Sequence, residues 1–131
     1  LMRSISDGLM HVVEDRDGRL IASFAVTTGA DKNYERGIDG AWMRDGSPYA
    51  VLRWACVERD ARRRGVGMFM IDKALSLARA AGCATLRCDI HPANDAMRGL
   101  LEKQEFTRCG TVEVRDALGR VKRRAAFERE V

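Results

Sequence analysis

"RDARRRGVGMFMIDKALSLARAAG" forms residues 59–82 of a chain of 131 residues. In its second half, apolar side chains recur at helical spacing and polar side chains avoid their face. Gly82 stands where a left-handed glycine commonly follows the end of a helix. The pattern predicts an α-helix over residues 65–81 that opens on Gly65 and Gly67. Its expected apolar face comprises Val66, Met70, Ala74, Leu77, Ala78 and Ala81.

Three consecutive arginines, Arg62–Arg64, come directly before this helix. A glycine turn at a helix start exposes backbone N–H groups at the positive end of the helix dipole, and glycine lets an anion approach closely. Arginines add permanently charged donors, so the turn is typical of a pyrophosphate site. It is not a Walker loop, because no GxxxxGK(S/T) pattern occurs, and it is not a complete Rossmann fingerprint, because Met70 stands where the third glycine would be. A plain helix turn with solvated arginines is the alternative.

The rest of the chain alternates strand patterns with turns and one further helix. The central strand–helix–strand unit predicts a parallel pair inside a largely antiparallel sheet. The expected fold class is therefore α/β, or α+β in stricter usage, in a single domain, residues 1–131. Strands are predicted at 9–14, 19–28, 49–58, 83–90, 106–114 and 121–131, with a short helix after Asn94 or Asp95 and a long loop at 29–48.

Composition limits the function classes. The chain is 46% hydrophobic and carries a net charge of +4, which suits a globular domain with an anionic partner. Its four cysteines form no CxxC pair and it has two histidines, so no metal site is expected and the cysteines are interpreted as small core residues. No apolar run of about 18 residues and no signal peptide pattern occur, so we expect a cytoplasmic protein with no membrane partner.

Two motifs resemble those of the GNAT superfamily of N-acetyltransferases. "VERDARRRGVG", residues 57–67, is similar to the acyl-CoA-binding segment, in which Arg/Gln-x-x-Gly-x-Gly/Ala opens a helix after a strand-ending valine. "NDAMRGLLEKQEF", residues 94–106, is similar to the second motif, an asparagine and a short amphipathic helix. The resemblance covers residues 12–131 and implies a GNAT-type sheet whose parallel pair splays apart around acetyl-CoA.

The resemblance also implies which residues hold acetyl-CoA. The backbone of residues 55–57 would run beside the pantetheine arm, and the glycine turn with Arg62–Arg64 would hold the pyrophosphate. Asn94 would hydrogen-bond the pantetheine, and a helix cap is an equally weighted alternative. The implied cofactor-binding residues are Ala55, Cys56, Val57, Arg62, Arg63, Arg64, Gly65, Val66, Gly67, Met68 and Asn94.

Acetyl transfer from a thioester to an amine needs a proton acceptor. Asp89 is the first candidate, because it occupies the position of a general-base glutamate in some GNAT members. His91 lies on the same predicted strand face, and Glu58 at the end of the central strand is the third candidate. An ordinary solvent-facing charge is the alternative for each. In the long loop, Tyr34 could line the acceptor pocket, whereas anchoring the loop is the favoured role for Trp42.

Three departures from the family pattern stand out. Leu101 occupies the position at which many members have a tyrosine that protonates the leaving thiolate. Glu105 replaces a glycine, and a left-handed turn there would cost a non-glycine residue about 1 kcal/mol. The family usually opens with a strand and two helices that wall the acceptor site. Because the chain begins with Leu1 and its first clear strand starts near Leu9, we expect those elements to be missing.

Three functional hypotheses follow. The leading one is an acetyl-CoA-dependent N-acetyltransferase acting on a primary amine of a small molecule or peptide. The second is a catalytically silent GNAT-fold domain that binds acyl-CoA as a ligand or regulator. The third, a nucleic-acid-binding module using Arg62–Arg64 and Lys122–Arg124, is disfavoured by 6% aromatic content and the lack of a recognition motif. No nucleic-acid partner is therefore expected, and the sequence leaves monomer and homodimer open.

Overall fold

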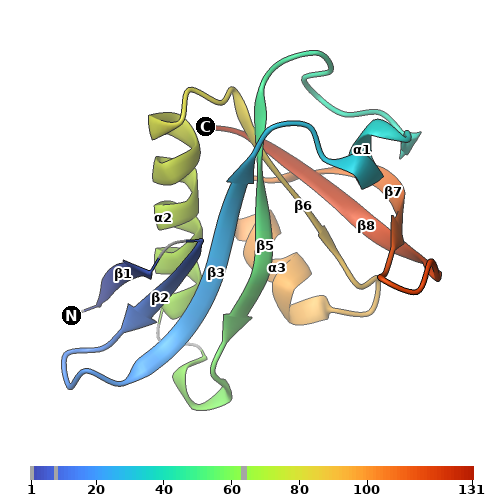
Figure 1. The fold of residues 1–131 in the computed structure, drawn as a ribbon. Helices are drawn as coiled ribbons and strands as arrows, with labels where there is room; N and C mark the ends of the chain where they lie inside the picture. Colours follow the sequence, from blue (N-terminus) through green and yellow to red (C-terminus); the bar gives the residue numbers. More distant parts are fainter. Residues whose placement is uncertain (1, 8, 63–64) are drawn as a thin grey trace.

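The computed structural model describes residues 2–7, 9–62 and 65–131. Its strands form one mixed sheet in the order β1-β2-β3-β5-β6-β8-β7-β4 (Figure 1). Among the described strand pairs, β5 and β6 alone run parallel, which confirms the predicted fold class. The strands are β1 (Arg3–Asp7), β2 (Met10–Glu14), β3 (Leu20–Thr28), β4 (Asp39–Gly40), β5 (Tyr49–Val57), β6 (Thr85–Ile90), β7 (Thr107–Arg115) and β8 (Val121–Glu130).

Helices lie on both faces of the sheet (Figure 1). One face carries α2 (Val66–Ala80) and α3 (Asp95–Lys103), and the main core lies between these helices and the strands. The short helix α1 (Lys32–Glu35) packs on the other face, where it closes a second, smaller apolar cluster. That cluster contains Tyr34, Tyr49, Val51, Val112 and Ala126.

The predicted helix of residues 65–81 is α2, and it ends as expected. Gly82 has φ +79°, and the Cys83 N–H donates to the Ala78 carbonyl at 3.1 Å, which closes the helix in a Schellman turn. The predicted apolar face is correct except at its C-terminal end, where Leu77 is half-buried and Ala81 exposed. The buried stripe is wider than predicted, because α2 packs against several strands at once; it comprises Val66, Met70, Ile71, Ala74, Leu75 and Ala78.

The structure differs from the sequence analysis at the N-terminus. We expected no strand before Leu9, yet β1 pairs antiparallel with β2, with Ile5 opposite Val12. The segment "RSISD" contains a single aliphatic residue, so it offers no apolar alternation that would mark a strand. The segment is a strand because it pairs with the neighbouring strand β2, and its own sequence pattern does not indicate this pairing.

Candidate functional site

The parallel strands β5 and β6 separate in the middle of the sheet. Their ladder pairs Tyr49 with Thr85, Ala50 with Leu86 and Val51 with Arg87, and it ends there. Beyond this point β5 continues to residue 57 and β6 to residue 90 along diverging paths (Figure 1). The predicted splayed pair is therefore confirmed.

An irregularity in β5 accompanies this separation. The ladder between β3 and β5 shifts register between Ser23 and Ala25, and on β5 Trp54 has φ +52°. A bulge of this kind increases the local strand twist. The predicted residues Ala55, Cys56 and Val57 all lie just beyond it, on the part of β5 that has left β6. Cys56 is exposed, so the prediction that it is a core residue is wrong: the bulge changes which face of β5 it occupies.

The N-terminus of α2 presents backbone donors next to this diverging segment. Gly65 is the N-cap with φ +77°, and as a glycine it has no side chain that could cap the helix. The first helical bond runs from the Phe69 N–H to the Gly65 carbonyl at 3.0 Å, so the N–H groups of the preceding residues 66–68 point out of the helix. Arg62 is extended and exposed just before the turn. These features fit a pyrophosphate group, whereas Arg63 and Arg64 lie outside the described residues.

Gly67 also has a packing role that the sequence analysis did not predict. A Cβ at this position would lie 2.8 Å from Cδ2 of Leu100, so the glycine lets α2 approach α3 closely. On α3, Asn94 is the N-cap, and its side chain accepts a hydrogen bond from the Met97 N–H at 3.1 Å. The capping role of Asn94 is thus confirmed, and a contact with pantetheine stays a prediction. Met68 is exposed in the first turn of α2.

Asp89 lies on the opposite sheet face from α2, near the point where β5 and β6 separate. Its side chain is 18% exposed, and its two carboxylate oxygens have different partners. The Tyr34 hydroxyl donates to Oδ1 at 2.6 Å, and Nε of Arg124 donates to Oδ2 at 3.0 Å. Burial first, and then the Asp89 charge, raise the pKa of Tyr34 well above 10, so this hydroxyl stays a donor at neutral pH.

The other two base candidates lie in different surroundings. His91 is exposed, and its Nδ1 accepts a hydrogen bond from the Ala93 N–H at 3.0 Å, within its own turn. Glu58 forms an ion pair with Arg19 at the far end of β5. No contact among the described residues joins Glu58 to Asp89. The structure therefore brings one candidate, Asp89, into a polar network and leaves the other two outside it.

A buried ion pair anchors the long loop of residues 29–48, and the sequence analysis missed it. Arg87 donates to Glu128 at 2.9 Å, and both side chains are almost wholly buried. The Arg87 guanidinium lies 4.1 Å from the ring centre of Trp42 and 3.9 Å from that of Tyr49. Trp42 thus anchors the loop, as predicted, and its buried Nε1 has no hydrogen-bond partner in the part of the chain that the structure describes. The available signal was an arginine between the apolar residues Leu86 and Cys88 of a strand.

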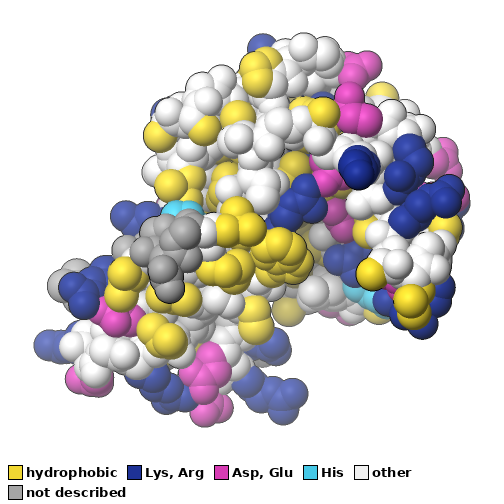
Figure 2. Space-filling model, in the orientation of Figure 1, with side chains coloured by type: hydrophobic (Ala, Val, Ile, Leu, Met, Phe, Trp, Pro, Cys, Tyr) yellow, Lys and Arg dark blue, Asp and Glu magenta, His cyan; other side chains and the backbone are white. Residues whose placement is uncertain are grey.

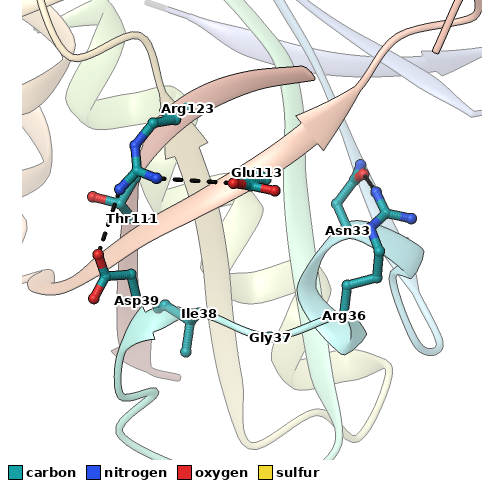
Figure 3. Close-up of a pocket in the computed structure, with 8 residues that line it drawn as sticks. All are labelled: Asn33, Arg36, Gly37, Ile38, Asp39, Thr111, Glu113 and Arg123. Atoms are coloured by element: carbon teal, nitrogen blue, oxygen red, sulfur yellow. Dashed lines mark hydrogen bonds and ion pairs between the residues drawn. The ribbon is translucent and has the colours of Figure 1, made fainter. Parts of the chain in front are cut away.

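A cavity of about 430 Å³ lies elsewhere, between the segment after α1 and the edge of β7 (Figure 3). Its charged groups largely pair with one another, since Arg123 lies 3.4 Å from Asp39 and 3.8 Å from Glu113. None of the predicted site residues that the structure describes lines it; the lining residues are Asn33, Arg36, Gly37, Ile38, Asp39, Thr111, Glu113 and Arg123. Within the described residues, no group of acidic, histidine or cysteine side chains could hold a metal ion. None of the described helices has the length and apolar character needed to cross a membrane.

A family model described as the acetyltransferase (GNAT) family matches residues 3–106. The chain belongs to the GNAT family of acetyltransferases. The two sequence motifs, residues 57–67 and 94–106, indicate the same family. The left-handed turn expected at Glu105 is also present, with φ +64°, and Leu101 is fully buried in the main core.

Solved GNAT structures share this fold. A GNAT acetyltransferase from Streptococcus agalactiae is 25% identical with a TM-score of 0.78, and the match covers 95% of this chain and 66% of that one. The ribosomal-protein-S18-alanine N-acetyltransferase of Escherichia coli is 17% identical with a TM-score of 0.62, covering 94% and 68%. A phosphinothricin acetyltransferase from Sinorhizobium meliloti, solved with AcCoA, is 16% identical with a TM-score of 0.65, covering 93% and 60%. The chain thus spans about two thirds of these relatives, and no curated protein matches it.

Proposed function

We propose that this protein is an acetyl-CoA-dependent N-acetyltransferase that acetylates a primary amine of a small molecule or peptide. The observation that carries the proposal is the separation of β5 from β6 beside the uncapped N-terminus of α2. This arrangement combines an open strand edge with a cluster of anion-binding N–H groups. Asp89 lies on the opposite sheet face at the same separation, where an acceptor could meet the thioester.

The chain's own residues would divide the binding of acetyl-CoA between two elements. The backbone of residues 55–57 would hydrogen-bond the pantetheine arm, much as a neighbouring strand would. The N–H groups of residues 65–68, together with Arg62–Arg64, would hold the pyrophosphate. Asn94 would add one amide contact. Acetyl-CoA supplies the acetyl group as a reactive thioester.

Asp89 is the proposed proton acceptor. In the transfer, the amine nitrogen forms a bond to the acetyl carbon, the carbon–sulfur bond breaks, and the amine loses a proton. Each carboxylate oxygen offers two lone-pair sites, so the bonds from Tyr34 and Arg124 leave acceptor capacity for the amine. Since Leu101 is an apolar core residue, the departing thiolate would take its proton from water or from the substrate ammonium.

A second candidate, a silent domain that binds acyl-CoA as a ligand, is favoured by the burial of Leu101 at the family's tyrosine position. Two measurements separate the candidates. Both predict that acetyl-CoA raises the melting temperature, because a ligand that binds only the folded state stabilises it. Only the enzyme releases CoA thiol with a panel of amines. A strong thermal shift with no thiol release from any amine would leave the silent reading.

The role of Asp89 is tested by Asp89→Asn, which keeps the shape of the side chain and removes the base. We expect kcat/KM to fall by about 10²–10⁴-fold while the acetyl-CoA thermal shift is retained. His91→Gln is the matched control, because His91 lies two residues away and outside the network. A wild-type rate for Asp89→Asn together with a large loss for His91→Gln would transfer the role to His91.

We also propose a cytoplasmic location. It is supported by the four cysteines, which are all free, as in proteins kept in a reducing compartment.

A further inference from the structure

A polar network crosses the sheet face opposite α2 and α3, and none of the predicted roles requires all of it. Tyr34 connects two ion pairs. Its backbone N–H donates to Asp31 at 3.1 Å, and its hydroxyl donates to Asp89 at 2.6 Å. Asp31 in turn pairs with Arg53, and Asp89 pairs with Arg124. The chain of contacts therefore runs through these five residues, which come from β5, β6, β8 and the segment around α1.

The two arginines flank the separation of β5 and β6. Because Val51 pairs with Arg87 in parallel register, Arg53 and Asp89 each lie two residues beyond the last pair and share one face. Arg124 reaches Asp89 from β8, the next strand of the sheet. Figure 2 shows this face: hydrophobic side chains gather over β3 and β5, basic side chains gather on the side of β7 and β8, and the surface is hollowed between them.

Each arginine keeps donor capacity that the network does not use. Arg53 donates through Nε to Thr27 at 2.8 Å and through Nη2 to Asp31. Arg124 donates through Nε and Nη2 to Asp89. Nη1 of neither arginine takes part in a hydrogen bond with the described residues. The side chains are 29% and 31% exposed, so both guanidinium groups can donate to a ligand at the surface.

The charges favour a particular kind of acceptor. The network holds two cations and two anions, so it is neutral overall. An amine that arrives as a lone ammonium adds an unbalanced positive charge beside two guanidinium groups. An acceptor with its own carboxylate adds no net charge, and its carboxylate can accept charge-assisted bonds from the unused Nη1 donors.

We propose that the acceptor is a free α-amino acid, whose amine faces Asp89 and whose carboxylate binds Arg53 and Arg124. The inference rests on the proposed acetyl transfer and specifies its substrate class. Trp54 follows Arg53 on β5 and is 63% exposed. L-Phenylalanine is a convenient first probe, because L-phenylalanine amide and phenethylamine are matched analogues of it without the carboxylate.

The test compares L-phenylalanine, L-phenylalanine amide and phenethylamine as acceptors, with CoA thiol release as the rate measurement. We expect kcat/KM for L-phenylalanine to exceed that for phenethylamine by about 10- to 100-fold, the usual range for hydrogen bonds to a charged group. L-Phenylalanine amide is nearly the same size as L-phenylalanine but lacks the negative charge, so it tests the effect of the carboxylate charge separately from the effect of size. Equal values of kcat/KM for the three compounds would overturn the proposal.

Arginine variants locate the recognition. The measured quantity is the ratio of kcat/KM for L-phenylalanine to kcat/KM for phenethylamine. Arg53→Gln should reduce this ratio to within about threefold of one, and Arg124→Gln should do the same. Arg123→Gln is the control, since Arg123 neighbours Arg124 but pairs with Asp39 and Glu113. Because Arg53→Gln leaves Asp31 buried without its cation and could fail to fold, Arg124→Gln repeats the test independently. A ratio unchanged in the folded variants would refute recognition by these arginines.

Equilibrium binding separates this inference from the proposed function. The same three compounds are titrated by calorimetry against wild type and the arginine variants in the presence of CoA, without turnover. One outcome is that L-phenylalanine binds more tightly than the other two compounds, that this preference depends on the arginines, and that the separate assay with acetyl-CoA shows no thiol release. This outcome would support the carboxylate site and refute acetyl transfer. Acetylation of all three compounds at similar rates and with similar affinities would support acetyl transfer and refute the carboxylate site.

Discussion

Glu128→Gln tests whether the buried ion pair controls the stability of this fold. The Glu128 carboxylate is fully buried and accepts hydrogen bonds from four donors. Oε2 accepts from Thr85 at 2.7 Å and from Arg87 at 2.9 Å, and Oε1 accepts from the Met43 N–H at 2.6 Å and the Arg44 N–H at 3.4 Å. The substitution keeps the side-chain volume almost unchanged, so it reports on charge and hydrogen bonding rather than on packing.

The magnitude follows from what glutamine lacks. If its carbonyl oxygen takes the Oε2 position, its NH₂ group faces the Met43 N–H, and two donors then oppose each other. A buried donor without an acceptor costs about 1–3 kcal/mol. The guanidinium of Arg87 also loses its counter-charge in a site where it is 2% exposed. Breaking a buried pair by neutralising one partner costs about 3–5 kcal/mol in total, and we expect a loss in that range.

Glu130→Gln is the matched control on the same strand. Glu130 pairs with Arg44 at 3.1 Å, but its side chain is 59% exposed. An exposed pair contributes about 0–1 kcal/mol, so this variant should unfold close to the wild type. The assay is urea unfolding followed by circular dichroism, with hydrogen exchange at Met43 and Arg44 to detect release of the loop. A loss below about 1 kcal/mol for Glu128→Gln, or equal losses for both variants, would refute the reasoning.

Three further predictions concern other positions. Glu105→Gly should leave the free energy of unfolding equal or raise it by up to about 1 kcal/mol, since glycine relieves the left-handed φ of +64°; clear destabilisation in urea would contradict this. Burial raises the pKa of Tyr34 above its unfolded value of 10.0, so its contribution to stability is complete below about pH 10 and is lost as the pH rises further. Tyr34→Phe should flatten that alkaline loss in unfolding measured from pH 8 to 11, and an identical slope would argue against it. Cys56 is exposed, whereas Cys88 is buried and burial raises the pKa of its thiol. A thiol reagent should therefore label Cys56 first and Cys88 only on unfolding, and acetyl-CoA should slow the labelling of Cys56. Rapid labelling of Cys88 in the native protein would contradict its burial.

Local features of this fold could be predicted from the sequence because a few neighbouring residues determine each of them. The left-handed turn at Glu105 was expected because the family has a glycine at that position. The Gly82 helix end and the Asn94 cap follow from contacts within about one helical turn. The glycine turn at Gly65 belongs to this group, since its conformation and the helix after it are set by adjacent residues. The GNAT fold itself was identified from the resemblance of two motifs, residues 57–67 and 94–106, to those of the family.

Only the tertiary structure decided which polar side chains meet. Tyr34 and Asp89 are 55 positions apart, and Arg87 and Glu128 are 41 apart. Their contacts exist because β8 lies between β6 and β7 and because the long loop folds back over that face. The periodicity of a single segment does not predict such a long-range contact, because the order of strands in the sheet depends on the free energy of the whole core. The sequence therefore determined the fold and the turn beside α2, and the sheet order determined the network around Asp89.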